Sequence, residues 1–144
     1  EQFSESNEFT LRIGQNVSKQ QLLKKMRVAH PATFVKHEVY RDFGMFSEGF
    51  RIAADHEFLL RIWDKVAIGF LPETLVRMKI GGISTNQFVA SYRESMAAAI
   101  LNGMPPTSAY VTYNYEILKN ILLNISRKQR SAFGSQDIKT NFSQ

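Results

Sequence analysis

The spacing of apolar and polar residues along the chain predicts a series of helices. A short helix begins after Ser18, because Gln21 follows three residues later in the capping-box pattern, where each side chain bonds the other's backbone. The most apolar helix follows Asp55, and its residues Phe58 and Ile62 share one face at four-residue spacing. This pattern predicts that the second helix is held in the core, with Asp55 at its rigid end.

Two longer helices are predicted in the C-terminal part of the chain. One begins at Ser84, which forms a second capping box with Gln87, and ends at about Leu101. The other is capped by Thr107 or Ser108 and ends at about Ile125. Its expected buried side consists of Val111, Leu118, Leu122 and Ile125. Plain core packing is favoured for both apolar faces, and a dimer face or contact with a membrane surface are the alternatives.

Four segments are typical of strands. Thr10–Ile13 is a short one that Gly14 closes. Val66–Leu71 is apolar on both faces, and Thr74–Ile80 alternates between apolar and basic residues. Pro31 biases the residue before it towards an extended backbone, so Ala32 and Phe34 are expected on a strand that enters the core.

These elements predict an α/β protein that forms part of a larger domain. Too few strands alternate with helices for a complete doubly wound sheet. We expect residues 1–125 to belong to that larger domain and the polar residues 126–144 to be a disordered tail. The first residue is Glu1 rather than Met, which also indicates a fragment.

The composition is that of an ordinary globular domain. The 144 residues are 44 % hydrophobic and 22 % charged, and no apolar run approaches the roughly 18 residues of a membrane span. Cysteine is absent, which excludes disulfides and thiolate metal sites and fits a cytoplasmic location. The formal net charge of +5 allows an anionic partner, but a solvated surface with excess Lys and Arg is the favoured explanation.

Asp55 is the main candidate for chemistry, with three alternative roles. It is an N-cap that accepts the backbone N–H of Glu57 or Phe58, an ion-pair partner of Arg61 or another cation, or a general base. The two alanines before it leave space for a bound hydroxyl group. Capping is the commonest role for aspartate at a helix start. Separately, Glu57 and Arg61 are four residues apart and are expected to pair across the surface.

Two other segments contain candidate site residues. His30 is a satisfied buried histidine, a substrate or diphosphate contact, or a metal ligand, and no other histidine stands at metal-ligand spacing. Gly81-Gly82-Ile83-Ser84 opens a helix, where free backbone N–H groups can bind phosphate. A tight turn that requires glycine is the simpler explanation of this segment.

Five segments between about Met26 and Ser84 occur in a specific order and spacing. They are His30-Pro31-Ala32-Thr33-Phe34-Val35, Tyr40-Arg41-Asp42-Phe43-Gly44-Met45-Phe46, Ala53-Ala54-Asp55-His56-Glu57-Phe58-Leu59-Leu60-Arg61, Leu71-Pro72-Glu73-Thr74-Leu75-Val76 and Gly81-Gly82-Ile83-Ser84. In this order they resemble the family 2 nucleotide-sugar glycosyltransferases, which have the GT-A fold.

The resemblance implies the C-terminal, acceptor-side half of a three-layer α/β/α domain. In such enzymes the aspartate that matches Asp55 deprotonates an acceptor hydroxyl, which attacks the anomeric carbon of a nucleotide sugar with inversion. The implied acceptor is a glycan or glycolipid of cell-surface polysaccharide biosynthesis. Asp55 can act as a base and cap the helix at the same time.

The resemblance also implies particular contacts and a metal ion. The substrate-binding residues that it implies are His30, Glu48, Gly82 and Ser84. The loop of residues 44–50 would border the acceptor, although Ser47 stands where the family often has an acid. The family binds Mg or Mn through an Asp-x-Asp motif. This chain contains no such motif, so we expect the ligands upstream of Glu1 and no activity from the fragment alone.

The alternative function is a non-catalytic basic module that binds an anionic membrane or a nucleic acid. Against it, the basic residues are scattered and no nucleic-acid motif occurs, so no nucleic-acid partner is expected. Peripheral contact with the inner face of a membrane and a homodimer are compatible with either function.

Overall fold

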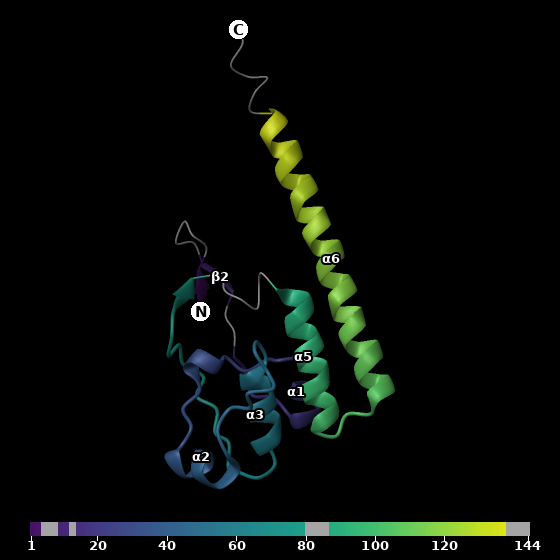
Figure 1. Cartoon of the computed structure of the whole chain (residues 1–144). Coiled ribbons are helices and arrows are strands. Elements are labelled where there is room, and N and C mark those ends of the chain that lie inside the picture. The colour runs from purple at the N-terminus through teal and green to yellow at the C-terminus, as the bar shows by residue number, and fades with distance from the viewer. Residues whose placement is uncertain (4–8, 12–13, 80–86, 138–144) are drawn as a thin grey trace.

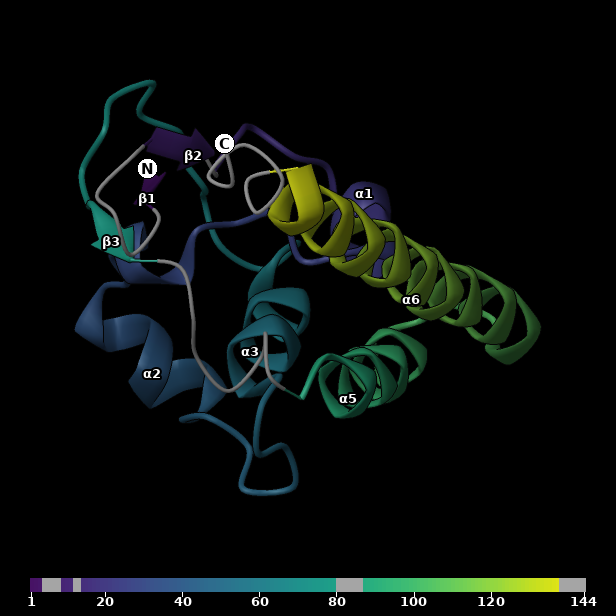
Figure 2. The same cartoon turned by 90° about the horizontal axis from the view of Figure 1, so that it is seen from above.

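The described part of the chain is mostly helical. The computed structural model describes residues 1–3, 9–11, 14–79 and 87–137. Its helices are α1 (Lys19–Lys24), the 3₁₀ helix η1 (His30–Ala32), α2 (His37–Phe43), α3 (Ala54–Ile62), α5 (Phe88–Leu101) and α6 (Pro106–Asp137). Helix α3 lies in the middle, with α2 and the strands on one side and α5 and α6 on the other (Figures 1 and 2).

The capping box at the start of α1 is confirmed. The Gln21 N–H donates to the Ser18 hydroxyl at 3.3 Å, and the Ser18 N–H donates to Oε1 of Gln21 at 2.9 Å. Leu22 follows and is fully buried. The box therefore fixes the point at which this short helix enters the core.

Helix α3 supplies the centre of the core, as predicted. Its buried residues are His56, Glu57, Phe58, Leu59, Leu60 and Ile62. Leu59 and Leu60 belong to a cluster that α1, α5, α6 and the α5–α6 turn complete with Leu22, Ala98, Ala99, Met104, Ala109 and Tyr113. Because the helix is held from several sides, its first turn has a fixed position.

Helices α5 and α6 pack closely together because small side chains meet between them. Ala98, Ala99 and Ala109 are each 0 % exposed. Tyr113 adds a hydrogen bond from its hydroxyl to the Leu23 carbonyl at 2.7 Å. Lys25 also reaches α6, where its Nζ lies 2.8 Å from the Glu116 carboxylate.

The boundaries of α5 match the prediction at one end. The helix ends at Leu101, Asn102 bonds back to Ala98, and Gly103 has a φ of 102° that favours glycine. The capping box expected at Ser84 lies outside the described residues. Within them, Gln87 is the N-cap of α5 and its side chain makes no capping hydrogen bond.

Three very short strands form a mixed sheet in the described residues. They are β1 (Gln2–Phe3), β2 (Phe9–Leu11) and β3 (Met78–Lys79), in the order β2-β1-β3. Strand β1 pairs antiparallel with β2 and parallel with β3. The backbone nitrogen of Glu1 donates to the Val76 carbonyl at 2.9 Å, which adds a hydrogen bond next to the pairing of β1 with β3.

Strand β2 overlaps the predicted Thr10–Ile13, but the other predicted strands are largely wrong. Val66–Leu71 contains no strand, and Leu71 is 62 % exposed. Thr74–Ile80 yields only β3, with Ile80 outside the described residues. The segment around Pro31 forms the 3₁₀ helix η1 instead of a strand, and Phe34 is 84 % exposed. A strand requires a hydrogen-bonding neighbour, which local alternation of apolar residues does not supply.

Helix α6 differs from the prediction in its length and in its buried face. The backbone stays helical to Asp137, in place of the tail expected from Ser126, and residues 138–144 lie outside the described part. The side expected to be buried is exposed, at 68 % for Val111, 56 % for Leu118 and Leu122, and 49 % for Ile125. Ala109 and Tyr113 are buried in its place.

The observed fold class is therefore a mostly helical arrangement with a small sheet, and it contains the two C-terminal helices that the sequence predicts. The three-layer α/β/α architecture stays a prediction. None of the described helices is both long enough and apolar enough to cross a membrane.

Candidate functional site

Asp55 lies in the first turn of α3, one residue inside the helix. The N-cap is Ala53, so the interpretation of Asp55 as the N-cap is wrong. Its Oδ1 accepts the N–H of His56 at 2.8 Å, which satisfies one of the free donors of the first turn. Asp55 is only partly buried, so its carboxylate combines a fixed position with access to solvent.

The start of α3 is capped by a carboxylate from another helix. Oε2 of Glu94, on α5, accepts the N–H of Ile52 at 2.7 Å and that of Ala53 at 2.9 Å. These two groups immediately precede the helix, whose positive end also favours a nearby negative charge. Glu94 thus holds the backbone next to Asp55. It also lines an open surface hollow of about 530 Å³ at the start of α5.

Sequence reasoning missed Glu94 because it lies 41 and 42 residues from its partners. It carries no motif of its own, and the α5 sequence around it is an ordinary helical pattern. Only the packing of α5 against α3 brings the carboxylate to the two N–H groups.

His56 anchors the first turn of α3 from its inner side. The ring is 1 % exposed, and Nε2 lies 2.8 Å from the Leu22 carbonyl, an acceptor that requires the proton on Nε2. Nδ1 is buried with no hydrogen-bond partner. Burial lowers the pKa of His56, and the Leu22 carbonyl and the Asp55 charge offset this only in part. His56 is therefore a neutral structural contact beside Asp55.

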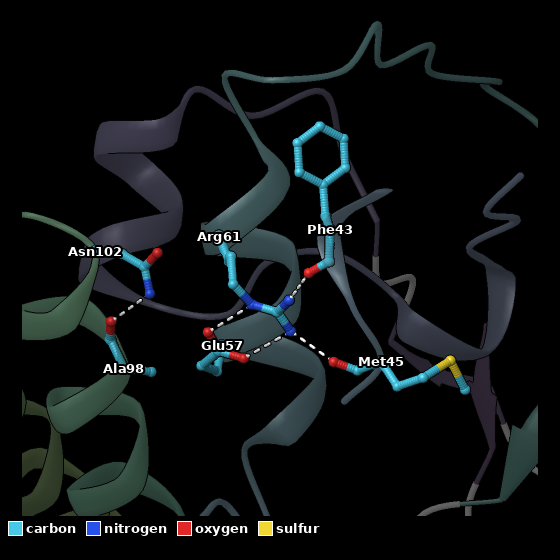
Figure 3. Close-up of polar contacts among 6 residues, drawn as sticks. All are labelled: Phe43, Met45, Glu57, Arg61, Ala98 and Asn102. Atoms are coloured by element: carbon cyan, nitrogen blue, oxygen red, sulfur yellow. Dashed lines mark hydrogen bonds and ion pairs between the residues drawn. The ribbon is translucent and has the colours of Figure 1, made fainter. Parts of the chain in front are cut away.

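Arg61 joins the end of α3 to the loop after α2 (Figure 3). Its guanidinium donates to both carboxylate oxygens of Glu57, at 3.0 and 3.2 Å, so the predicted pair is confirmed. The same group donates to the Phe43 carbonyl and, at 2.7 Å, to the Met45 carbonyl. Glu57 is 6 % exposed, so the pair lies in the interior rather than across the surface. Asp55 is not the partner of Arg61.

Gly44 lies between Phe43 and Met45, the two residues whose carbonyls bind Arg61. It ends α2 with a φ of 81°, and a Cβ at this position would meet Nη1 of Arg61 at 3.4 Å. The glycine thus turns the chain so that its carbonyl neighbours face the guanidinium.

Aromatic rings attach the same loop to α3. Phe46 lies 5.1 Å from Phe58 between ring centroids, and Tyr40 stacks on Phe58 at 5.1 Å. The His30 ring meets the edge of Phe46 at 5.8 Å. These contacts gather η1, α2 and the loop on the side of α3 that carries Phe58.

The predicted substrate contacts have different fates. His30 is exposed, so its interpretation as a buried histidine is wrong, and the ring is available beside the loop. Glu48 is exposed in the turn that the Phe50 N–H closes on the Ser47 carbonyl at 3.2 Å. Gly82 and Ser84 lie outside the described residues. The structure thus brings His30 and the Glu48 loop together through Phe46, and α3 connects that cluster to Asp55.

The described side chains do not form a metal site. Among the residues that the structure describes, no group of three His, Asp or Glu side chains could hold a metal ion. The Mg or Mn ion that the resemblance implies does not fit the residues described here.

The comparisons with known proteins identify no relative. No protein-family model, no curated protein and no solved structure matches this chain. The resemblance and the roles that it implies rest on the sequence segments alone.

Proposed function

We propose that this chain is the acceptor-side part of an inverting, GT-A-type family 2 glycosyltransferase, with Asp55 as its general base. The carboxylate takes the proton of an acceptor hydroxyl as the oxygen attacks the anomeric carbon of a nucleotide sugar. The bond from that carbon to the diphosphate breaks on the opposite side, and the nucleoside diphosphate leaves with the electron pair.

One observation carries the proposal, namely the placement of Asp55. A general base must be accessible to the proton that it removes and must be held in position. Asp55 is partly exposed on the first turn of a helix that is otherwise mostly buried. Glu94 holds the backbone before Asp55. The next residue, His56, is held by its contact with the Leu22 carbonyl.

The loop of residues 44–50 supports an acceptor site beside this helix. Arg61 holds its first part through the Phe43 and Met45 carbonyls, and Phe46 packs on Phe58. Glu48 and the His30 ring remain exposed next to these anchors. Exposed polar groups on an anchored loop suit the recognition of sugar hydroxyls. The proposal therefore keeps His30 and Glu48 as acceptor contacts.

The proposal places donor and metal binding outside the described residues. This agrees with the absence of an Asp-x-Asp motif from the sequence. Gly82 and Ser84 stay candidate phosphate contacts on the basis of their sequence segment. The proposal also includes a cytoplasmic location, where nucleotide sugars are available.

The test is an Asp55→Asn substitution in the full-length protein, assayed for release of nucleoside diphosphate in the presence of acceptor. Loss of a general base lowers kcat by roughly 10²–10⁴-fold. Donor affinity, measured by calorimetry, should stay within about twofold, since Asp55 acts on the acceptor.

Asp64→Asn is the matched control. Asp64 is an exposed aspartate just after the same helix, paired with Lys19 at 2.6 Å. We expect this variant to retain wild-type turnover. Undiminished turnover in Asp55→Asn, with Asp64→Asn equally active, would refute the role of Asp55.

A further inference from the structure

Helix α6 presents an apolar stripe to solvent. The stripe consists of Val111, Tyr115, Leu118, Leu122 and Ile125, which are 68, 62, 56, 56 and 49 % exposed. Large apolar side chains gathered on one exposed face mark a site of association more often than chance scatter does. Figure 1 shows α6 running beside α5 and continuing past it.

The stripe lies opposite the face that α6 packs on its own domain. That inner face consists of Ala109, Tyr113, Glu116 and Asn120, which are held by core packing, by the Leu23 carbonyl, by Lys25 and by the Tyr92 hydroxyl. Each of its members stands two residues before a member of the stripe, a rotation of about 200° around a helix. The described body of the domain therefore cannot cover the stripe without releasing the inner face.

The spacing within the stripe is that of a coiled coil. Its members are separated by four, three, four and three residues, which places them at alternating d and a positions of a heptad. Such side chains interlock with the same pattern on another helix. A stripe of this kind is self-complementary about a twofold axis, so a second copy of the chain provides a matching surface.

The geometry points to a homodimer in which the α6 stripes of two copies pack against each other. Each stripe residue exposes roughly 100 Å² of mostly apolar surface, so five of them offer about 500 Å² per copy. The neighbouring Tyr110 and Ile121 are 64 and 39 % exposed and widen the patch. The total for two copies then reaches the range of about 1,200 Å² at which specific interfaces begin.

Few basic residues stand along the stripe itself, and the basic residues Arg127, Lys128 and Arg130 follow its C-terminal end. Helices that bind anionic bilayers carry several Lys or Arg residues next to their apolar face. Between Pro106 and Ile125 the sequence contains one basic residue, Lys119. Its Nζ lies 3.9 Å from the carboxylate of Glu116, on the side towards the domain.

Light scattering on the 144-residue chain across a concentration series tests the dimer. We expect the mass to rise from 16.5 kDa towards twice that value. Leu118→Glu should raise the dimer dissociation constant roughly 100-fold, because the twofold axis brings two carboxylates into one apolar seam. Leu123→Glu is the matched control, since Leu123 is 45 % exposed on the same helix but lies off the stripe.

A second measurement uses the absence of cysteine from the chain. Leu118→Cys should form a covalent dimer on mild oxidation, and Leu123→Cys should form no cross-link although it still dimerises non-covalently. A monomer at every concentration, or a dimer that Leu118→Glu leaves intact, would overturn the proposal. The proposal would also be overturned by a monomer that sediments with phosphatidylglycerol vesicles and loses this binding in Leu118→Glu, since this result assigns the stripe to a lipid surface.

Discussion

The carboxylate of Glu94 should stabilise the fold by holding the start of α3. One oxygen accepts two backbone N–H groups, at 2.7 and 2.9 Å, across a span of more than forty residues. A hydrogen bond to a charged group contributes about 1.5–3 kcal/mol. Water replaces part of this contribution at a half-buried site, so we expect Glu94→Ala to lower the free energy of unfolding by about 2 kcal/mol.

Urea unfolding followed by Trp63 fluorescence measures this loss. Trp63 is the only tryptophan in the sequence and is the C-cap of α3, so its signal reports on the helix in question. The expected loss corresponds to a fall of roughly 1 M in the urea midpoint. Amide exchange at Ile52 and Ala53 should accelerate in the same variant.

Two further variants separate the hydrogen bonds from general effects. Glu94→Gln keeps an acceptor oxygen without the charge, so we expect about half of the loss seen in Glu94→Ala. Glu73→Ala removes an exposed glutamate and should leave the midpoint unchanged. If Glu94→Ala shifts the midpoint no more than Glu73→Ala does, the carboxylate is not holding α3 and the argument fails.

Two other predictions concern the residues around α3. The pKa of His56 is lowered below its usual 6.5 in the folded protein, so the unfolded chain binds the proton more readily. The contribution of neutral His56 to stability is therefore fully present above pH 6.5 and falls as the pH drops below it. The difference between the urea midpoints at pH 7.5 and 5.5 should be smaller for His56→Gln than for wild type. Equal differences in the two proteins would contradict this. Arg61→Lys should lose roughly 2 kcal/mol and speed amide exchange in the loop of residues 44–50, because lysine cannot bond Glu57 and two carbonyls together. Arg41→Lys is its control, as the Arg41 side chain is 66 % exposed, and equal exchange in both variants would contradict the anchoring role.

Local sequence features determined the elements whose signals act within a few residues. The Ser18–Gln21 box, the end of α2 at Gly44 and the pair of Glu57 with Arg61 all follow from contacts one helical turn apart. The apolar pattern of α3 also predicted its burial correctly. Such interactions form wherever the backbone is helical, so they can be read without knowledge of the rest of the fold.

Tertiary structure alone decided which surfaces meet. The expected strand Val66–Leu71 has the right residues but no pairing neighbour among the described residues, and its Ile68 is 49 % exposed. The α6 sequence has two faces that could be buried. Packing selected the one where the small Ala109 and the hydrogen-bonded Tyr113 fit α5 and α1.

The same division applies to the candidate site. The sequence placed Asp55 at the start of a rigid helix, and that position is confirmed, although Ala53 is the cap. The supports around it come from distant segments, namely Glu94 on α5 and the Leu22 carbonyl on α1. A lone carboxylate can be recognised from its neighbours in sequence. The groups that hold it still depend on how helices pack, and a helical pattern does not specify its partner.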